Sequence, residues 1–283
     1  VSLDSETGRN NMSCDTSKPE VVGLIPARGG SRRILRKNLV DLCGRPLIAY
    51  TIEASRRARC ITRTIVSTDD HEIADVSRRL GAEVPFLRPG RLATDTARSI
   101  DVIRHAARWL ENHGIRLRAM VLLQPTSPLR KAAHIDEAVR LFLGGGCDSV
   151  VSVRRCDGVM DRDKDGERNR KLLRSIRPGG WLAPWRGKPG GRIDRRLRPC
   201  GSERGRQVSV SGMQARSAAG VDLPCLLNGA VYVLGRRVIF GSVPIENRRT
   251  KAYIMPANVS VDVDTRKDLH AAERQLSRRG SAR

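Results

Sequence analysis

Two acidic side chains near the C-terminus have a spacing that could bind a divalent cation. Asp262 and Asp264 alternate with valines in the stretch SVDVDT, residues 260–265. We expect a strand over 259–263, on which residues two apart point to the same face, so the two carboxylates would lie together. Such a pair repels unless a cation separates it, and Mg²⁺ is usually held by one or two carboxylates plus phosphate oxygens and water. The alternative is a solvated polar strand face.

A basic stretch near the other end of the chain could bind phosphates. Residues 21–38 read VVGLIPARGGSRRILRKN. The apolar part predicts a buried strand that ends at Pro26. Gly29 and Gly30 would let backbone N–H groups line a concave loop among arginines and Lys37, which suits a run of phosphates. Because the stretch matches neither GxxxxGK[ST] nor GxGxxG, an ordinary basic surface loop is the alternative.

The elements that must position these residues alternate between strand and helix. We expect helices over about 46–59, 71–80, 97–113, 134–143 and 266–277, and strands over 21–25, 63–67, 84–87, 118–123, 149–153, 228–233, 251–255 and 259–263. We also expect Asp69 and Asp70 to cap the second helix, the alternative being phosphate-bound metal. The alternation predicts an α/β fold with a mainly parallel sheet and helices on both faces. The ligand crevice would then lie beyond the carboxyl ends of the strands, at loops 26–38, 67–70, 88–99 and 124–130.

Composition narrows the classes of partner. The chain has 283 residues and a formal charge of +23, which favours anionic partners, but only 3% aromatic residues, which argues against a base-stacking nucleic-acid binder. No apolar run is long enough for a membrane span, and residues 1–20 are polar, so we expect a flexible lead-in without a signal peptide. Seven scattered cysteines with no CxxC pair predict the reduced thiols of a cytoplasmic protein.

Several stretches together resemble the acylneuraminate cytidylyltransferases, the CMP-sialic acid synthetases. The most specific are IPARGGS followed by RKN, and LLQPTSPLR at 122–130. In the same order as in that family come IVSTDDHEIA (65–74), GAEVPFLRPGRLATDTA (81–97), DSVVSV (148–153), NGAVYV (228–233) and SVDVDT. The resemblance covers roughly 21–153 and 226–275. It implies a three-layer α/β/α Rossmann-like nucleotide-sugar transferase fold, in one domain over 21–283.

The resemblance also implies roles for individual residues. Lys37 would stabilise the transition state on the phosphates, and Asp262 and Asp264 would bind Mg²⁺. The residues implied to contact the cytidine nucleotide are Arg28, Ser31, Arg32, Asn38, Arg88 and Ser99, and those implied to face the sugar are Gln124, Asn228 and Tyr232. Without the resemblance, Tyr232 would be a core residue and Arg88 a surface residue. The implied reaction transfers CMP from CTP to the anomeric hydroxyl of a sialic acid, with pyrophosphate as the leaving group.

The segment 154–226 departs from the family pattern. In the family it is an insertion that builds a homodimer and lends side chains to the partner's sugar site. Here residues 154–216 hold 15 Arg and 3 Lys against 7 acidic residues, and no Arg-Gln stands directly before Leu223 and Pro224. In the basic loop, Arg33 stands where the family has Gly, so we expect its side chain to crowd the loop.

Three functions stay open at this level. The first is transfer of CMP to an acylneuraminate. The second is the same chemistry on another nonulosonic acid, such as legionaminic or pseudaminic acid, because sugar-contacting parts fall in the divergent segment. The third is a catalytically impaired homologue whose basic insertion binds nucleic acid, with strong salt dependence and no CTP turnover. The matched motifs favour the first.

Overall fold

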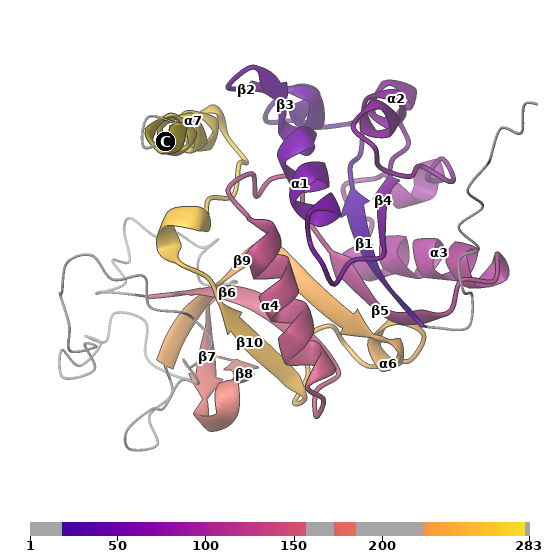
Figure 1. Ribbon diagram of the computed structural model, residues 1–283, viewed down its shortest axis with the longest axis vertical. Helices are drawn as coiled ribbons and strands as arrows, with labels where there is room; N and C mark the ends of the chain where they lie inside the picture. Colours follow the sequence, from indigo (N-terminus) through magenta and orange to yellow (C-terminus); the bar gives the residue numbers. More distant parts are fainter. Residues whose placement is uncertain (1–18, 157–172, 185–222, 281–283) are drawn as a thin grey trace, which may run out of the picture.

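The computed structural model describes residues 19–156, 173–184 and 223–280 (Figure 1). They form an eight-stranded sheet in the order β4-β1-β5-β9-β6-β10-β8-β7, and a separate hairpin of β2 and β3. The strands are β1 (Glu20–Pro26), β2 (Asp41–Leu42), β3 (Arg45–Pro46), β4 (Arg63–Ser67), β5 (Leu117–Leu122), β6 (Ser149–Arg155), β7 (Leu173–Arg177), β8 (Trp181–Pro184), β9 (Leu223–Gly235) and β10 (Thr250–Ile254). The helices are α1 (Leu47–Arg56), α2 (His71–Arg79), α3 (Ser99–Asn112), α4 (Ala132–Leu143), α6 (Arg236–Ile239) and α7 (Arg266–Gly280). Short 3₁₀ turns are η1 (Lys37–Leu39), η2 (Gly90–Leu92), η3 (Pro178–Gly180) and η6 (Ala257–Val259).

The sheet is mixed, so the expectation of an α/β fold is confirmed but that of a mainly parallel sheet is wrong. β1 runs parallel to β4 and β5, and β10 runs parallel to β6. β9 lies antiparallel between β5 and β6, and β7 and β8 pair antiparallel as well. Between β6 and β9 the described residues form β7, η3 and β8. Antiparallel neighbours do not need the long crossover connection that parallel strands need.

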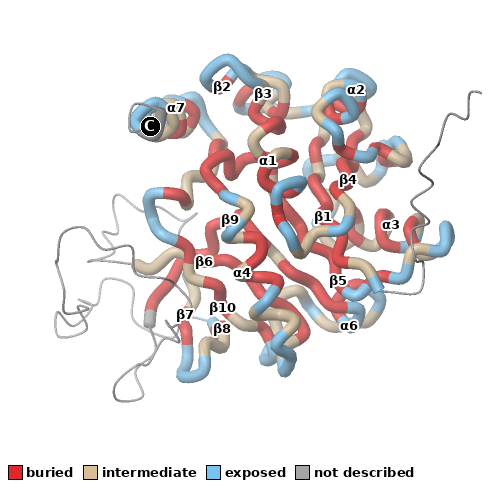
Figure 2. Tube along the Cα trace, in the orientation of Figure 1, coloured by how far each residue is buried: buried red, intermediate tan, exposed pale blue. Residues whose placement is uncertain are grey.

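The core lies on both faces of the sheet. Along β1, Val21 and Ile25 belong to the cluster that packs against α1 and α4, while Val22 and Leu24 belong to the cluster under α3 and α6. This alternation follows from the two-residue period of a strand. It explains why β1 is a continuous apolar run rather than an alternating one, and Figure 2 shows the strands buried along the middle of the fold.

Two predicted strands are wrong. Around 84–87 the structure has two isolated bridges, Ile65 with Glu83 and Thr68 with Leu87, in place of a strand. Pro85 between them has no N–H to donate to a neighbouring strand. Over 259–263 the chain leaves η6 and continues without a strand partner among the described residues. The backbone N–H groups of Val263 and of the following Asp264 donate instead to a loop carbonyl and to a side chain at the start of α7.

A separate hydrophobic cluster joins the two ends of the chain. Ile34 from the basic loop, Leu42 and Leu47 pack with Val263 and with Leu269 of α7, and all are buried. Figure 1 shows α7 beside the β2–β3 hairpin, although the two are more than 200 residues apart in the sequence. Burying apolar surface in this cluster therefore brings the basic loop and the Asp262–Asp264 segment together.

The predicted lead-in and most of the predicted insertion remain untested. Residues 1–18 of the lead-in, and 157–172 and 185–222 of the predicted insertion, lie outside the described residues. The rest of the insertion contributes β7, η3, β8 and the start of β9. Among the described helices, none combines the length and apolar character that crossing a membrane would require.

Candidate active site

Lys37 and Asp264 meet at the junction of the two chain ends. The Lys37 ammonium lies 2.9 Å from Asp264 Oδ1, and both side chains are mostly buried, with 18% and 20% exposed. Arg33 approaches the other oxygen, Oδ2, at 3.4 Å, but its side chain is 64% exposed. The expected crowding by Arg33 is therefore wrong, because its side chain points outward over the carboxylate. The positive φ of this loop falls on Arg36 instead, at 48°.

The segment of Asp262 and Asp264 is held by loop and cap contacts rather than by a sheet. Val263, between the two aspartates, is fully buried, and its N–H donates to Thr126 O at 2.8 Å. The N–H groups of Asp264 and Thr265 donate to Asp268 Oδ2, which closes the first turn of α7. The aspartates thus flank a buried anchor, which fixes their backbone without a strand.

The glycine loop is braced from two sides. The Gly29 N–H donates to Asp69 Oδ1 at 3.1 Å, and the buried side-chain amide of Asn38 donates to Arg28 O at 2.9 Å. The buried Ile34 anchors the loop between these points. These contacts hold the predicted phosphate loop in one conformation, and the Asn38 side chain stabilises its backbone.

Carboxylates of other segments face the arginines of this loop. Asp95 pairs with both Arg28 and Arg32. Its Oδ1 lies 2.5 Å from Arg28 Nη1, and its Oδ2 lies 2.5 Å from Arg32 Nη2. Arg36 pairs with Asp70 and Glu72 at the start of α2. Since phosphates bind guanidinium groups in the same way as carboxylates do, an incoming triphosphate would share or replace these partners.

The two acidic residues before α2 have different roles. Asp70 Oδ1 accepts from the Ile73 N–H at 2.9 Å, so the predicted cap is confirmed for Asp70. Asp69 instead accepts from Gly29 and lies 3.6 Å from Arg88 Nη2. Asp69 therefore links the glycine loop to Arg88.

Arg88 is a buried residue, so its interpretation as a surface arginine is wrong. Its backbone N–H donates to Thr68 O at 2.7 Å, which fixes the residue at the end of β4. Burial lowers the pKa of its guanidinium, and the nearby Asp69 carboxylate acts in the opposite direction. Nε and Nη2 of Arg88 make no hydrogen bond within the described chain. These groups are donors suited to a nucleotide oxygen.

The three residues predicted to face a sugar lie around a bend in β9. This bend is the point at Gly229, whose φ is positive, where the register of β9 with β6 shifts. The side chain of Gln124 lies over Gly229, where an added Cβ would be 3.2 Å from Oε1. Asn228 is buried and engaged by the fold: Oδ1 accepts from Ser152 Oγ, and Nδ2 donates to Ser260 Oγ. Burial, chiefly, raises the pKa of Tyr232 to about 12, and the charges of Glu246 and Asp262 add to the rise. Tyr232 thus keeps its hydroxyl proton at neutral pH.

The two serines of the predicted nucleotide site are placed differently. Ser31 is half-buried in the glycine loop. Ser99 is the exposed first residue of α3 and lines an open groove of about 1860 Å³ between α3, β7–β8 and residues 240–248. The other predicted site residues do not line this groove. Ser31 is thus part of the loop that carries Lys37, whereas Ser99 lines the groove.

The two aspartates fit Mg²⁺ only in company with other oxygen ligands. Within the described ranges, no cluster of three or more His, Cys, Asp or Glu side chains could hold a metal ion. Asp262 and Asp264 offer carboxylate oxygens, and Asp264 already attracts two cationic side chains. Because Mg²⁺ commonly takes one or two carboxylates plus substrate phosphates and waters, this donor set suits an ion that arrives with a triphosphate.

Sequence reasoning missed contacts of three residues of the site. Arg33 and Asp95 lie in loops, and no local pattern shows that they pair with Asp264 or bridge Arg28 and Arg32. Asp69 is predicted as a second capping residue or a metal ligand, but it contacts Gly29 and Arg88. The one available signal was Ile34, a lone apolar residue in a basic loop, which indicates a buried anchor there.

The glycine pair allows a matched test of the loop. A Cβ at Gly29 would lie 2.8 Å from Asp70 Oδ2, whereas a Cβ at Gly30 would meet nothing within 4 Å. Neither glycine has a positive φ. We expect Gly29→Ala to lower the affinity for CTP about ten-fold, because overpacking of 1–3 kcal/mol must be relieved by moving the loop. Gly30→Ala should stay within about two-fold of wild type.

Calorimetric titration with CTP, alongside melting temperatures, would measure both variants. Equal affinities of Gly29→Ala and Gly30→Ala for CTP would show that the loop does not bind the nucleotide.

Together, the fold and these contacts define an α/β protein with a basic glycine loop and an acidic segment at one site. A family model described as cytidylyltransferase matches residues 22–172. The chain belongs to this cytidylyltransferase family, so the resemblance noted from the sequence is confirmed.

Three curated relatives differ in the sugar that their names give. The chain is 43% identical over 133 residues to the CMP-N,N'-diacetyllegionaminic acid synthase of Legionella pneumophila, covering 47% of this chain and 57% of that protein. It is 39% identical over 125 residues to the N-acylneuraminate cytidylyltransferase of Escherichia coli, covering 44% and 29%. It is 37% identical over 120 residues to the pseudaminic acid cytidylyltransferase of Campylobacter jejuni, covering 42% and 52%. The chain thus spans about half or less of the length of these relatives.

A solved structure supports the fold across the chain. CMP:2-keto-3-deoxy-manno-octonic acid synthetase complexed with CTP superposes with a TM-score of 0.63 at 14% identity. The match covers 92% of this chain and 99% of the other. At this identity the likeness concerns the fold alone.

Proposed function

We propose that this protein transfers CMP from CTP to the anomeric hydroxyl of a nonulosonic acid of the acylneuraminate type. The anomeric oxygen forms a bond to the α-phosphorus, the bond from that phosphorus to the bridging oxygen breaks, and pyrophosphate leaves as the hydroxyl gives up its proton. The observation that carries the proposal is the contact between Lys37 and Asp264 across 227 residues of chain. Family membership and the names of the relatives support the class of nucleotide and sugar.

In this proposal the basic loop binds the triphosphate and Lys37 lies where negative charge develops. The N–H groups of the loop and the cations at Arg28 and Arg32 bind the phosphates, and Arg88 with Asn38 and Ser31 fixes the cytidine side. A compact ammonium that is mostly shielded from water stabilises a transition state more strongly than an exposed one. Mg²⁺ bound with the triphosphate at Asp262 and Asp264 would neutralise phosphate charge.

The acceptor would approach from the bend of β9. Gln124 offers an amide beside Gly229, and Tyr232 offers a hydroxyl that stays protonated. Both suit the hydroxyl and amide groups of a nonulosonic acid, which would be held with its anomeric oxygen toward the nucleotide. Asn228 is already engaged by Ser152, Ser260 and the Ala230 N–H, so in this proposal it shapes the pocket.

Pyrophosphate release tests the proposal directly. Purified protein with CTP and Mg²⁺ would be incubated separately with N-acetylneuraminic, N,N'-diacetyllegionaminic and pseudaminic acids, with UTP in place of CTP as the control. We expect release that requires both CTP and a sugar, fastest with N-acetylneuraminic acid. Faster release with another sugar would reassign the substrate, and no release with any sugar would refute the proposal.

We further propose that the protein works as a homodimer, since in the resembling family the segment after β6 builds the dimer. Light scattering after gel filtration should give twice the 31.3 kDa mass of the chain. A monomeric mass for the active protein would refute this part.

A further inference from the structure

Arg130 is a buried cation for which the proposed function has no use. Its side chain is almost inaccessible, the residue being 3% exposed, and burial lowers the pKa of the guanidinium to about 9. No acidic side chain of the described chain pairs with it, and its Nε and Nη2 make no hydrogen bond there. Burial of an uncompensated cation opposes folding, so whatever Arg130 contributes must come through the bonds that it does make.

Those bonds join two segments of the acceptor side. Nη1 of Arg130 donates to Gln124 O at 3.2 Å and to Ala230 O at 2.6 Å. Gln124 begins the loop that Arg130 ends, and Ala230 follows Gly229, whose φ is +70° and over which the Gln124 side chain lies. A single guanidinium nitrogen therefore fixes the backbone of Gln124 against the bend of β9.

The same loop also holds the acidic segment. Thr126 O, two residues after Gln124, accepts the Val263 N–H between Asp262 and Asp264. The basic glycine loop makes no such bond to residues 124–130 among the described residues: its backbone is braced by Asp69 and Asn38, and it meets the acidic segment through Ile34, Lys37 and Arg33. Displacement of the loop 124–130 would thus disturb Gln124 and the aspartates first, while the braces of the glycine loop stay in place.

We propose that Arg130 is a positioning residue that holds Gln124 and the Asp262–Asp264 segment in register for the acceptor sugar. This inference rests on the proposed function for its kinetic part, but its structural part can be tested without turnover. Lysine at this position keeps the charge, but its side chain is shorter and does not carry a donor as far as the position of Nη1 between the two carbonyls.

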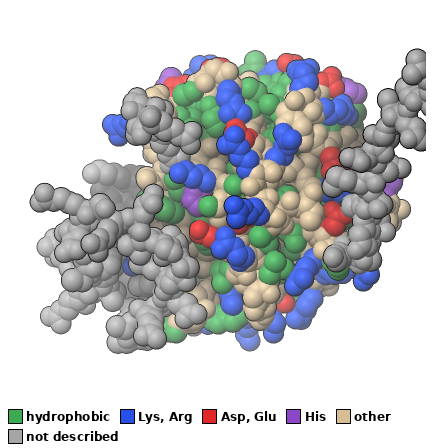
Figure 3. Space-filling model, in the orientation of Figure 1, with side chains coloured by type: hydrophobic (Ala, Val, Ile, Leu, Met, Phe, Trp, Pro, Cys, Tyr) green, Lys and Arg blue, Asp and Glu red, His purple; other side chains and the backbone are tan. Residues whose placement is uncertain are grey.

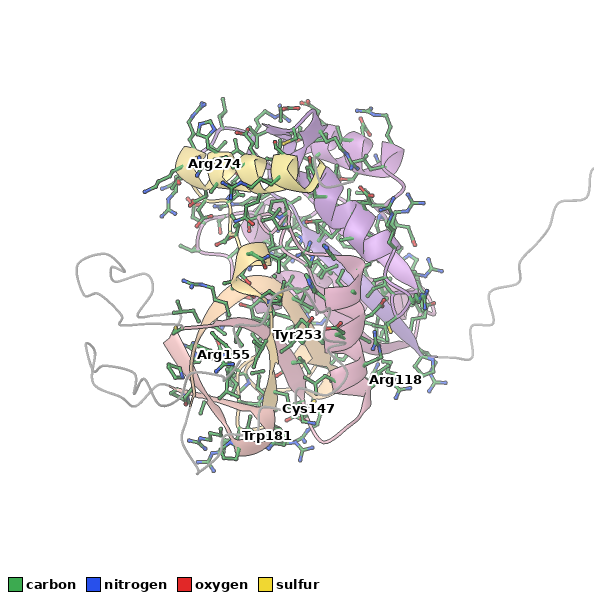
Figure 4. All side chains as sticks on the ribbon, turned by 60° about the vertical axis from the view of Figure 1, so that its left-hand side comes forward. Arg118, Cys147, Arg155, Trp181, Tyr253 and Arg274 are labelled. Carbon is green, nitrogen blue, oxygen red and sulfur yellow. The ribbon has the colours of Figure 1, made fainter. Side chains whose placement is uncertain are left out.

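Native-state hydrogen exchange is the structural test. In Arg130→Lys we expect the Val263 amide to exchange about ten-fold faster, while the amides of Val22 and Val121 in the central strands keep their protection. Arg118→Lys is the matched control, since Arg118 is an exposed arginine on β5 (Figure 4). Uniform acceleration of all three amides, or none, would overturn the inference.

A double-mutant cycle is the kinetic test. If Arg130 acts through Gln124, Arg130→Lys should raise KM for the sugar about ten-fold, and should add little once Gln124→Ala is present. The Kd for CTP measured without Mg²⁺, to which the aspartates do not contribute, should change by less than about two-fold. Additive effects of the two substitutions in an active enzyme would overturn this inference alone, whereas an inactive wild type would refute the proposed function as well.

Gly229→Ala keeps the inference testable if Arg130→Lys fails to fold. Its Cβ would lie 3.2 Å from Gln124 Oε1, on a backbone whose φ of +70° strains any side chain, with Arg130 intact. We expect the same rise in KM for the sugar at an unchanged Kd for CTP, and an unchanged KM would overturn the inference.

Discussion

Replacement of Lys37 by methionine is expected to lower kcat about 10²- to 10³-fold, the usual cost of losing a donor that stabilises transition-state charge. Lys37 is the cation of the basic loop that is both mostly buried and within 2.9 Å of Asp264. Methionine retains most of the side chain's apolar length, so packing in the loop should change little. Steady-state pyrophosphate release would give kcat, and the Kd for CTP should rise far less than kcat falls.

Two variants control for this result. Lys267→Met removes an exposed lysine from the nearby start of α7 and should leave kcat within about two-fold of wild type. Lys37→Arg keeps the charge in a larger group and should recover only part of kcat. Wild-type turnover in Lys37→Met would exclude Lys37 from the chemistry.

Asp264→Asn is expected to give the second large effect, a fall in kcat of about 10²-fold together with a rise in the Mg²⁺ concentration needed for half-maximal rate. The neutral amide is a weaker ligand for a divalent cation, and it no longer neutralises Lys37 and Arg33. The Mg²⁺ dependence of pyrophosphate release measures both quantities. Binding of Mn²⁺ in the presence of CTP, followed by electron paramagnetic resonance, should weaken in parallel.

Asp268→Asn is the matched control, since this neighbouring acid accepts backbone N–H groups at the start of α7. Loss of part of a helix cap should cost about 1 kcal/mol of the free energy of unfolding and leave the Mg²⁺ dependence unchanged. If Asp268→Asn shifted the Mg²⁺ dependence as far as Asp264→Asn, the loss would come from the fold of this segment and not from a ligand.

The parallel part of the fold could be predicted from the sequence because its signals are local. The apolar run of β1, the helix that follows Pro46 and the cap at Asp70 each depend on neighbouring residues. The direction of β9 could not be predicted. A strand of type NGAVYV pairs equally well in either direction, and the connection from β6 to β9 decides which one occurs.

The site likewise divides into residues that could be predicted from the sequence and residues that could not. Lys37, Asp262 and Asp264 could be chosen from residue types and from the family resemblance. The predicted reason for the aspartate pair, a shared strand face, is wrong, because Val263 packs with Ile34 and binds Thr126 O instead. Asp95 and Arg130 could not be found, since their partners are set by tertiary contacts between distant loops.

On the face seen in Figure 3, basic side chains of the described chain are spread among acidic ones rather than gathered in one patch. Within the described chain many basic side chains are paired with acids, as Arg36 is with Asp70 and Glu72, and as Arg237 and Arg249 are with Asp148. Most of the basic insertion on which the nucleic-acid alternative depends, residues 157–172 and 185–222, lies outside the described residues.

A crystal structure with CTP and Mn²⁺ would test the central claim most directly, the claim that the basic loop and the acidic segment bind one nucleotide. We expect the triphosphate to contact Lys37 Nζ and the Gly29–Gly30 backbone, with the anomalous signal of Mn²⁺ beside Asp264. Nucleotide bound elsewhere, for example in the groove between α3 and β8, with Lys37 still paired to Asp264, would contradict the claim.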